Sequence, residues 1–218
     1  MTGGASVTKH EAILEGAMGL FLEKGYPGTS MDEIAARAGV SKQTVYKHFA
    51  DKHSLFSAIL LATTGEVETL VRWTLEEFAD PQKADLAIDR LAQRFLYALM
   101  EPRLLRLRRL VIANADRFPD LGRTWYESGF ERILNTLAES FHRLNKLGLL
   151  NARDPLLAAN HFVGMLLWIP INKAMFTGSE QPFTEKELQH LAKTAAAAFL
   201  QAYGTENQKP RGRTRRSA

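Results

Sequence analysis

The stretch SMDEIAARAGVSKQTVYKHF, residues 30–49, predicts two short helices joined by a tight turn. Ser30 and Glu33 match a capping box, in which the serine hydroxyl accepts from the Glu33 backbone N–H and the glutamate side chain reaches back. Gly39 is expected to end the first helix, because glycine takes a positive φ at no steric cost. Ser41 then caps the second helix. This pattern is typical of a helix-turn-helix, whose second helix enters the major groove of DNA.

The apolar positions predict which side of the second helix faces a core. Ile34, Val40, Val45 and Phe49 supply apolar contacts, and Ala35 is small where two helices must cross closely. The other side chains are left to meet DNA, where lysine can read guanine, glutamine adenine, and a threonine methyl thymine. The candidate DNA-binding residues are Ser30, Ser41, Lys42, Gln43, Thr44, Tyr46, Lys47, His48 and Lys52.

Some of these candidates are expected to contact phosphate rather than bases. Ser30 and Lys52 lie at predicted helix N-termini, which attract phosphate. Tyr46 is assigned to phosphate, with core packing as the alternative. The helix pair could also be a plain αα-hairpin with a solvated outer face. Charge favours the DNA interpretation, because residues 37–56 carry four basic side chains and one acidic, whereas residues 1–36 carry two basic and five acidic.

The rest of the chain is predicted to be helical, since strand signals are nearly absent. The expected helices cover residues 9–24, 31–38, 42–48, 52–78, 83–100, 103–117, 119–146, a segment beginning at 155, and 185–203. The predicted fold class is therefore all-α, with about nine helices.

Composition excludes several kinds of site. The chain of 218 residues has no cysteine, and its six histidines are scattered singly, so neither disulfides nor a metal site is predicted. No Ser/His/Asp grouping or Gly-rich phosphate loop is present, so we expect neither an enzyme nor a cofactor. No apolar run reaches about 18 residues and no signal peptide is visible, which predicts a cytoplasmic protein without membrane contact.

The net charge of +4 comes from the end of the chain. The last ten residues carry five basic side chains and no acidic one, so residues 1–208 sum to −1. The stretch from Thr205 onward is polar and basic, and we expect it to be disordered.

The run FLEKGYPGTSMDEIAARAGVSKQTVYKHFADKHSLF, residues 21–56, resembles the N-terminal domain of TetR-type transcriptional regulators. The run LRRLVIANADRFPDLGRTWYESGF, residues 107–130, is similar to the AefR-like subgroup. The resemblance implies a DNA-binding domain, residues 1–56, a ligand-binding and dimerisation domain, residues 57–204, and a tail, residues 205–218. Gln43 stands where the family commonly has a small residue, which makes it a candidate for operator-specific readout.

The resemblance also implies a homodimer formed by the last two helices of each chain. The helix from residue 155 is apolar nearly all round, and Gly164 would let another helix approach closely. The helix over 185–203 is rich in alanine, which also suits tight packing. Two such helices from each chain would form a four-helix bundle.

A pocket for an apolar effector is expected among bulky side chains of the larger domain. The candidate ligand-binding residues are Phe95, Leu99, Leu107, Val111, Asn114, Trp125, Phe130, His161, Met165 and Trp168. Alternatively, these residues simply fill a core, and His161 is a core or interface histidine. The arginines at 103, 106, 108 and 109 are interpreted as a solvated face, with an arginine that meets an acidic ligand as the alternative.

The sequence therefore predicts a cytoplasmic homodimeric regulator, most simply a repressor, that binds a palindromic double-stranded operator and is released by an apolar small molecule. Two other classes stay open. One is a helical small-molecule-binding protein or enzyme with a vestigial helix-turn-helix. The other is a DNA-binding protein that responds to a protein partner or to its own concentration.

Overall fold

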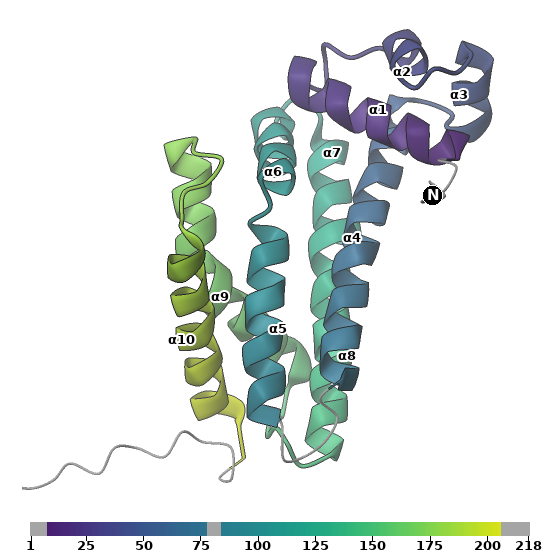
Figure 1. Ribbon diagram of the computed structural model, residues 1–218. Coiled ribbons are helices and arrows are strands. Elements are labelled where there is room, and N and C mark those ends of the chain that lie inside the picture. The colour runs from purple at the N-terminus through teal and green to yellow at the C-terminus, as the bar shows by residue number, and fades with distance from the viewer. Residues whose placement is uncertain (1–7, 78–83, 206–218) are drawn as a thin grey trace, which may run out of the picture. The chain divides into compact units, whose positions relative to one another are not determined.

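The computed structural model describes residues 8–77 and 84–205, which are almost entirely helical (Figure 1). The elements are α1 (Lys9–Lys24), α2 (Met31–Arg37), α3 (Lys42–His48), α4 (Lys52–Glu77), α5 (Ala84–Leu99), α6 (Pro102–Asn114), α7 (Pro119–Thr124), the π-helix η2 (Trp125–Glu131), α8 (Arg132–Lys146), α9 (Pro155–Thr177) and α10 (Glu185–Tyr203). Within the described residues, extended pairing is limited to one isolated bridge between Leu150 and Gly204. The all-α prediction is confirmed, with nine helices when α7, η2 and α8 count as one. The predicted ends at residues 78 and 83, and the tail after Thr205, lie outside the described residues.

One predicted helix contains an irregular segment, and both ends of another differ from the prediction. The segment 119–146 is continuous but contains η2, whose i→i+5 bonding is a rare local widening that apolar spacing alone does not reveal. The helix predicted over 103–117 begins one residue earlier, at Pro102, because a proline fits the first turn where its missing N–H has no partner to lose. α6 ends at Asn114, three residues earlier than expected.

The chain folds into two compact units. Residues up to Gly65 together with Arg106–Glu131 form the first unit, and Glu66–Leu105 together with the residues from Arg132 onward form the second. The first unit therefore includes most of α6, α7 and η2, although the sequence boundary at residue 57 separated them from the helix-turn-helix. Contacts inside this unit explain the grouping, since the Tyr26 and Phe118 rings lie 5.3 Å apart.

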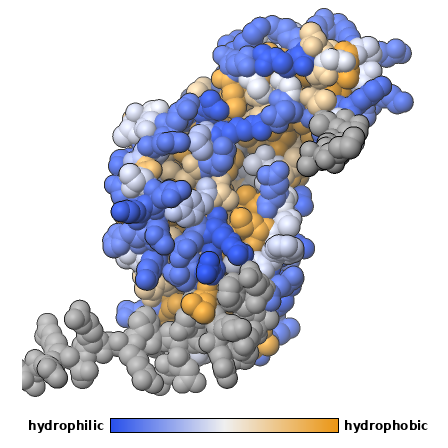
Figure 2. Space-filling model, in the orientation of Figure 1, coloured by the Kyte–Doolittle hydropathy of each residue, from blue (hydrophilic) through white to orange (hydrophobic). Residues whose placement is uncertain are grey.

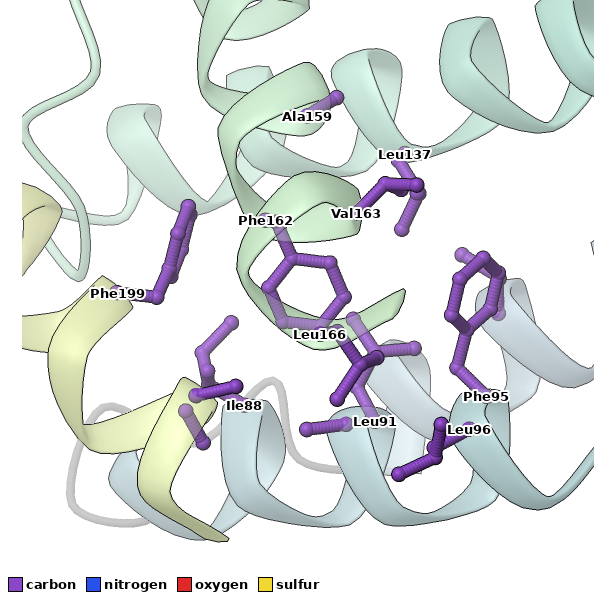
Figure 3. Packing of buried hydrophobic residues seen from close by; sticks show 14 of the residues in the cluster. Ile88, Leu91, Phe95, Leu96, Leu137, Ala159, Phe162, Val163, Leu166 and Phe199 are labelled. Carbon is purple, nitrogen blue, oxygen red and sulfur yellow. The ribbon is translucent and has the colours of Figure 1, made fainter. Parts of the chain in front are cut away.

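The second unit has a large apolar core formed mainly by α5, α8, α9 and α10, to which α4 adds Val67 and Val71. Phe162 of α9 lies at its centre, with its ring 5.2 Å from that of Phe199 and 5.7 Å from that of Phe141 (Figure 3). All three side chains are fully buried, and each such burial contributes roughly 1.5–3 kcal/mol.

Two helices are long and apolar enough to cross a membrane by length and composition, namely Lys52–Thr74 within α4 and Pro155–Thr177. The sequence criterion of an unbroken apolar run missed both. In α9 a buried face explains much of the apolar character, since Ala159, Phe162 and Leu166 pack into the core. Core helices of this kind pass the same test.

Candidate nucleic-acid interface

The helix-turn-helix folds around side chains that α1, α2 and α3 share. Ile13, Ile34 and Val45, one from each helix, are fully buried. Ala35 is also buried, as expected for a small residue at a helix crossing. These contacts fix α3 against α1 and α2, so that its remaining sides face outward.

The turn between α2 and α3 depends on Gly39. Its φ is +65°, in the region that favours glycine, and an added Cβ would meet nothing within 4 Å. The Val40 N–H donates to the Ala35 carbonyl at 3.1 Å and the Gly39 N–H to the Ala36 carbonyl at 3.3 Å. This pair of bonds is a Schellman motif, which confirms the predicted role of the glycine.

Capping side chains lie at the N-termini of α2, α3 and α4, at the positions that the sequence predicted. Ser30 accepts from the Glu33 N–H at 3.3 Å, and the Glu33 carboxylate accepts from the Ser30 N–H at 2.9 Å. Hydrogen bonds from Lys24 and Ser30 lower the pKa of Glu33 to about 2. The carboxylate already occupies this N-terminus, so a phosphate there would meet a negative charge. Ser41 caps α3 and Asp51 caps α4.

The outer side of α3 carries most of the candidate DNA-binding residues. Ser41, Lys42, Gln43, Tyr46, Lys47 and His48 are exposed, and Thr44 is half-buried with its hydroxyl 2.8 Å from that of Ser41. Tyr46 has 46% of its surface exposed, so core packing does not account for it. The surface over α1–α3 is mostly hydrophilic in the view of Figure 2.

The cations around α3 differ in their partners. Lys42 forms an ion pair with Asp32 of α2 at 2.8 Å, and Arg37 donates to Glu23 at 2.6 Å. Among the described residues, Lys47 has no such partner. Both pairs are well exposed and contribute little to stability. DNA can therefore compete for the Lys42 ammonium at small cost, while Lys47 is available directly.

Lys52 is held inside the first unit. Its ammonium donates to the carbonyls of Tyr26 at 2.7 Å and Thr29 at 2.9 Å, and it lies 4.6 Å from the centre of the Tyr26 ring. Burial lowers the pKa of this ammonium. Two of its three N–H groups thus stabilise the turn between α1 and α2. The sequence predicted only a phosphate contact for Lys52 and did not predict this structural role.

Two further features of the interface were missed. An added Cβ at Gly16 would lie 3.2 Å from Arg37 Cγ, so α1 and α2 approach closely there. The His10 ring lies 5.6 Å from that of His48 and 5.1 Å from that of Phe49, which connects the start of α1 with the end of α3. Both features join residues more than 20 apart, so no local spacing signals them.

The candidate ligand-binding residues of the first unit do not share one environment. Leu107 and Val111 are buried, and Trp125 is half-buried. Asn114 borders an open pocket of about 380 Å³ between α1 and α6, and its side-chain amide donates to the carbonyl of Leu110. Phe130 is exposed, with its ring 5.7 Å from that of Tyr126.

The candidates of the second unit separate into two groups. Phe95 and Leu99 lie in the core, whereas Met165 and Trp168 are exposed on the outer face of α9. The exposed His161 has its Nδ1 2.5 Å from the Tyr203 hydroxyl. The expectation that His161, Met165 and Trp168 line a common interior pocket with Phe95 is therefore wrong, because the helix turns them away from the buried side. A larger open pocket of about 750 Å³ lies between α4 and α5 beside Trp73 and Arg94, which the sequence did not single out.

Two family models match the chain. Residues 13–59 match the bacterial regulatory proteins of the tetR family, and residues 87–205 match the C-terminal domain of AefR-like transcriptional repressors. The first matched segment contains the helix-turn-helix, and the second contains most of the core of the second unit.

Two similar proteins are described as HTH-type regulators of transcription. The HTH-type transcriptional activator FasR of Mycolicibacterium smegmatis is 40% identical over 68 residues, which cover 31% of each chain. The HTH-type transcriptional repressor AcnR of Corynebacterium efficiens is 32% identical over 90 residues, 38% of this chain and 48% of that protein. The matched segments thus span less than half the length of these relatives.

Solved structures match over most of the chain. One from Mesorhizobium loti, assigned to the TetR family of transcriptional regulators, has 47% identity and a TM-score of 0.82, covering 90% of this chain and 97% of that one. The flavonoid-responsive regulator FrrA has 28% identity and a TM-score of 0.68, covering 91% and 98%.

Proposed function

Because the chain belongs to the TetR family of bacterial regulatory proteins and carries an AefR-like C-terminal domain, we propose that it is a ligand-responsive repressor that binds a palindromic operator as a homodimer. The observation that carries the proposal is the outer side of α3, which is exposed, polar and basic while its inner side is fixed by Val45. Such a regulator acts in the cytoplasm, where the chromosome is.

The exposed side chains of α3 have distinct roles in this proposal. Gln43 reads a base edge, since its amide can bond adenine bidentately. Lys47 and Tyr46 contact phosphates, which position the helix without reading sequence. Lys42 exchanges its Asp32 partner for DNA. Lys52 supports the motif mainly through its two carbonyl contacts.

Dimerisation is assigned to the outer faces of α9 and α10. α9 exposes a row of large apolar side chains: Leu156, Leu157, Met165, Trp168, Ile169 and Phe176. Trp168 and Phe176 have 73% and 85% of their surface exposed. Monomeric proteins rarely expose apolar patches of this kind, and a two-fold axis would cover the row with its own copy. Ala197 and Ala198 of α10 are also exposed, and their small side chains leave room for a close approach.

A small molecule is the proposed signal. The similarity to a regulator described as flavonoid-responsive supports a small aromatic or apolar effector. The effector lowers operator affinity by binding preferentially to a conformation that fits the operator poorly, and linkage requires DNA to weaken effector binding by the same factor.

The proposal is tested by fluorescence anisotropy with DNA from upstream of the protein's own gene. Lys47→Ala and Tyr46→Phe should weaken binding to every sequence, and Lys47→Ala should lower the salt slope by about one. Gln43→Ala should instead change base preference at one position per half-site. Lys146→Ala, at the exposed end of α8, is a control that should leave affinity unchanged. Equal operator affinity of wild type and the three α3 variants would refute the role of α3.

A further inference from the structure

Arg108 stands apart from the other arginines of α6. Its guanidinium carbon lies 5.7 Å from the centre of the Trp125 ring, across from the start of η2. Within residues 8–77 and 84–205, this ring is its one partner, and no carboxylate faces it. Its helix neighbours Arg103, Arg106 and Arg109 each have other interactions. In the part of the chain that the structure describes, Arg108 is thus a cation without an anionic partner.

The surroundings of Arg108 make this isolation costly. The neighbouring Leu107 and Val111 are buried, and Arg108 and Trp125 are half-buried. Burial lowers the pKa of Arg108 to about 10, so the side chain stays charged at neutral pH although it has lost much of its water. A desolvated charge without a partner destabilises a fold, and such groups cluster at functional sites.

The guanidinium is suited to one class of ligand. An indole ring lies 5.7 Å from its central carbon, and its N–H donors form a planar fork that matches a carboxylate. The Trp125 ring supplies an apolar surface for the rest of a ligand. η2 begins at this residue, and π-helical turns occur frequently at functional sites.

We propose that Arg108 and Trp125 recognise the carboxylate of an apolar organic acid, so that the effector is an anion rather than a neutral apolar molecule. This deepens the proposed function, since it names the chemical class of its effector. The site lies in the same unit as the helix-turn-helix. Thr124, the neighbour of Trp125, has its hydroxyl 3.5 Å from Nε2 of His53 at the start of α4.

The test is calorimetric titration of the full-length protein with matched pairs of acids and amides: benzoate with benzamide, cinnamate with cinnamamide, and octanoate with octanamide. Wild type should bind at least one acid about tenfold or more tightly than its amide, the factor that a charge-assisted hydrogen-bond pair supplies. Arg108→Met should remove that preference and leave amide binding unchanged. The matched control is Arg117→Met, because exposed Arg117 lies 5.5 Å from the Phe118 ring in a similar geometry, and it should keep the preference.

Thermal melting separates a binding role from a structural one. Arg108→Met should melt at or above the temperature of wild type, since it removes an unpaired charge and keeps an apolar stem. Wild type that prefers no acid over its amide would overturn the proposal, as would an unchanged preference in Arg108→Met. Operator binding without any ligand is measured separately. Its absence would contradict the proposed repressor without touching the acid preference, and acid binding that leaves the operator complex intact would contradict only the signalling role.

Discussion

Gly164 provides a test of the proposed dimer, because Gly164→Ala should stabilise an isolated chain but destabilise a dimer that is closely packed at this residue. It lies in the exposed face of α9, and an added Cβ would meet nothing within 4 Å in the single chain. For an isolated chain, Gly164→Ala should therefore stabilise the helix by about 0.8–1.0 kcal/mol, the difference in helix propensity.

A partner helix crossing at this face reverses the expectation. Overpacking a close contact costs about 1–3 kcal/mol, and a two-fold axis places two such sites in each dimer. The dimer should then lose about 2–6 kcal/mol, which raises its dissociation constant by about 30-fold to 10⁴-fold. The matched control is Gly19→Ala in α1, where the added Cβ would meet only the tip of Arg37 at 3.4 Å.

Sedimentation velocity over a dilution series measures the dimer Kd, and urea unfolding at fixed concentration measures stability. We expect Gly164→Ala to dissociate at concentrations where wild type and Gly19→Ala are dimers. A Gly164→Ala protein that is more stable and equally dimeric would refute the assignment of this face to a close helix crossing.

Three further predictions concern the first unit. Gly39→Ala should destabilise it by about 1–2 kcal/mol in urea unfolding, because only the left-handed φ is at stake and the new methyl has space. The pKa of Glu33 is about 2 against an ordinary 4.5, so the contribution of this carboxylate to stability is complete above pH 4.5 and is lost as the pH falls toward 2. The melting temperature should therefore fall more steeply between pH 4.5 and 2 in wild type than in Glu33→Gln. Parallel curves of melting temperature against pH would contradict this role of Glu33. Asp32→Asn should tighten DNA binding for all sequences in anisotropy titrations, because it releases Lys42 and removes a negative charge beside α3, whereas unchanged affinity would mean that Lys42 stays away from DNA.

The parts of the fold that sequence predicts well are those set by neighbours in the chain. The capping box of Ser30 and Glu33 spans four residues, and the turn at Gly39 requires a single backbone conformation. Both are confirmed because each depends only on local hydrogen bonds. The long helices are predictable from apolar spacing in the same way.

Features that depend on distant contacts were not predictable. Lys52 has the position of a phosphate ligand, yet its ammonium reaches carbonyls 23 and 26 residues away. Trp168 and Phe162 belong to the same apolar helix, and only the packing of α5, α8 and α10 decides that Phe162 is buried and Trp168 is exposed. The spacing within one helix cannot choose between these faces when both are apolar.

The π-helix η2 also affects which changes of length the helical segment 119–146 tolerates. α8 presents Leu134, Leu137, Phe141 and Leu144 to the core of the second unit, while α7 and η2 belong to the first. One residue more or less in a helix turns every later side chain by about 100°. A π-helical turn holds one residue more than an α-helical turn, so loss of one residue within Trp125–Glu131 is taken up by a return to ordinary α-helical winding, whereas loss of one residue inside α8 turns part of its apolar stripe away from the core. The length of α8 is thus constrained more tightly than the length of η2.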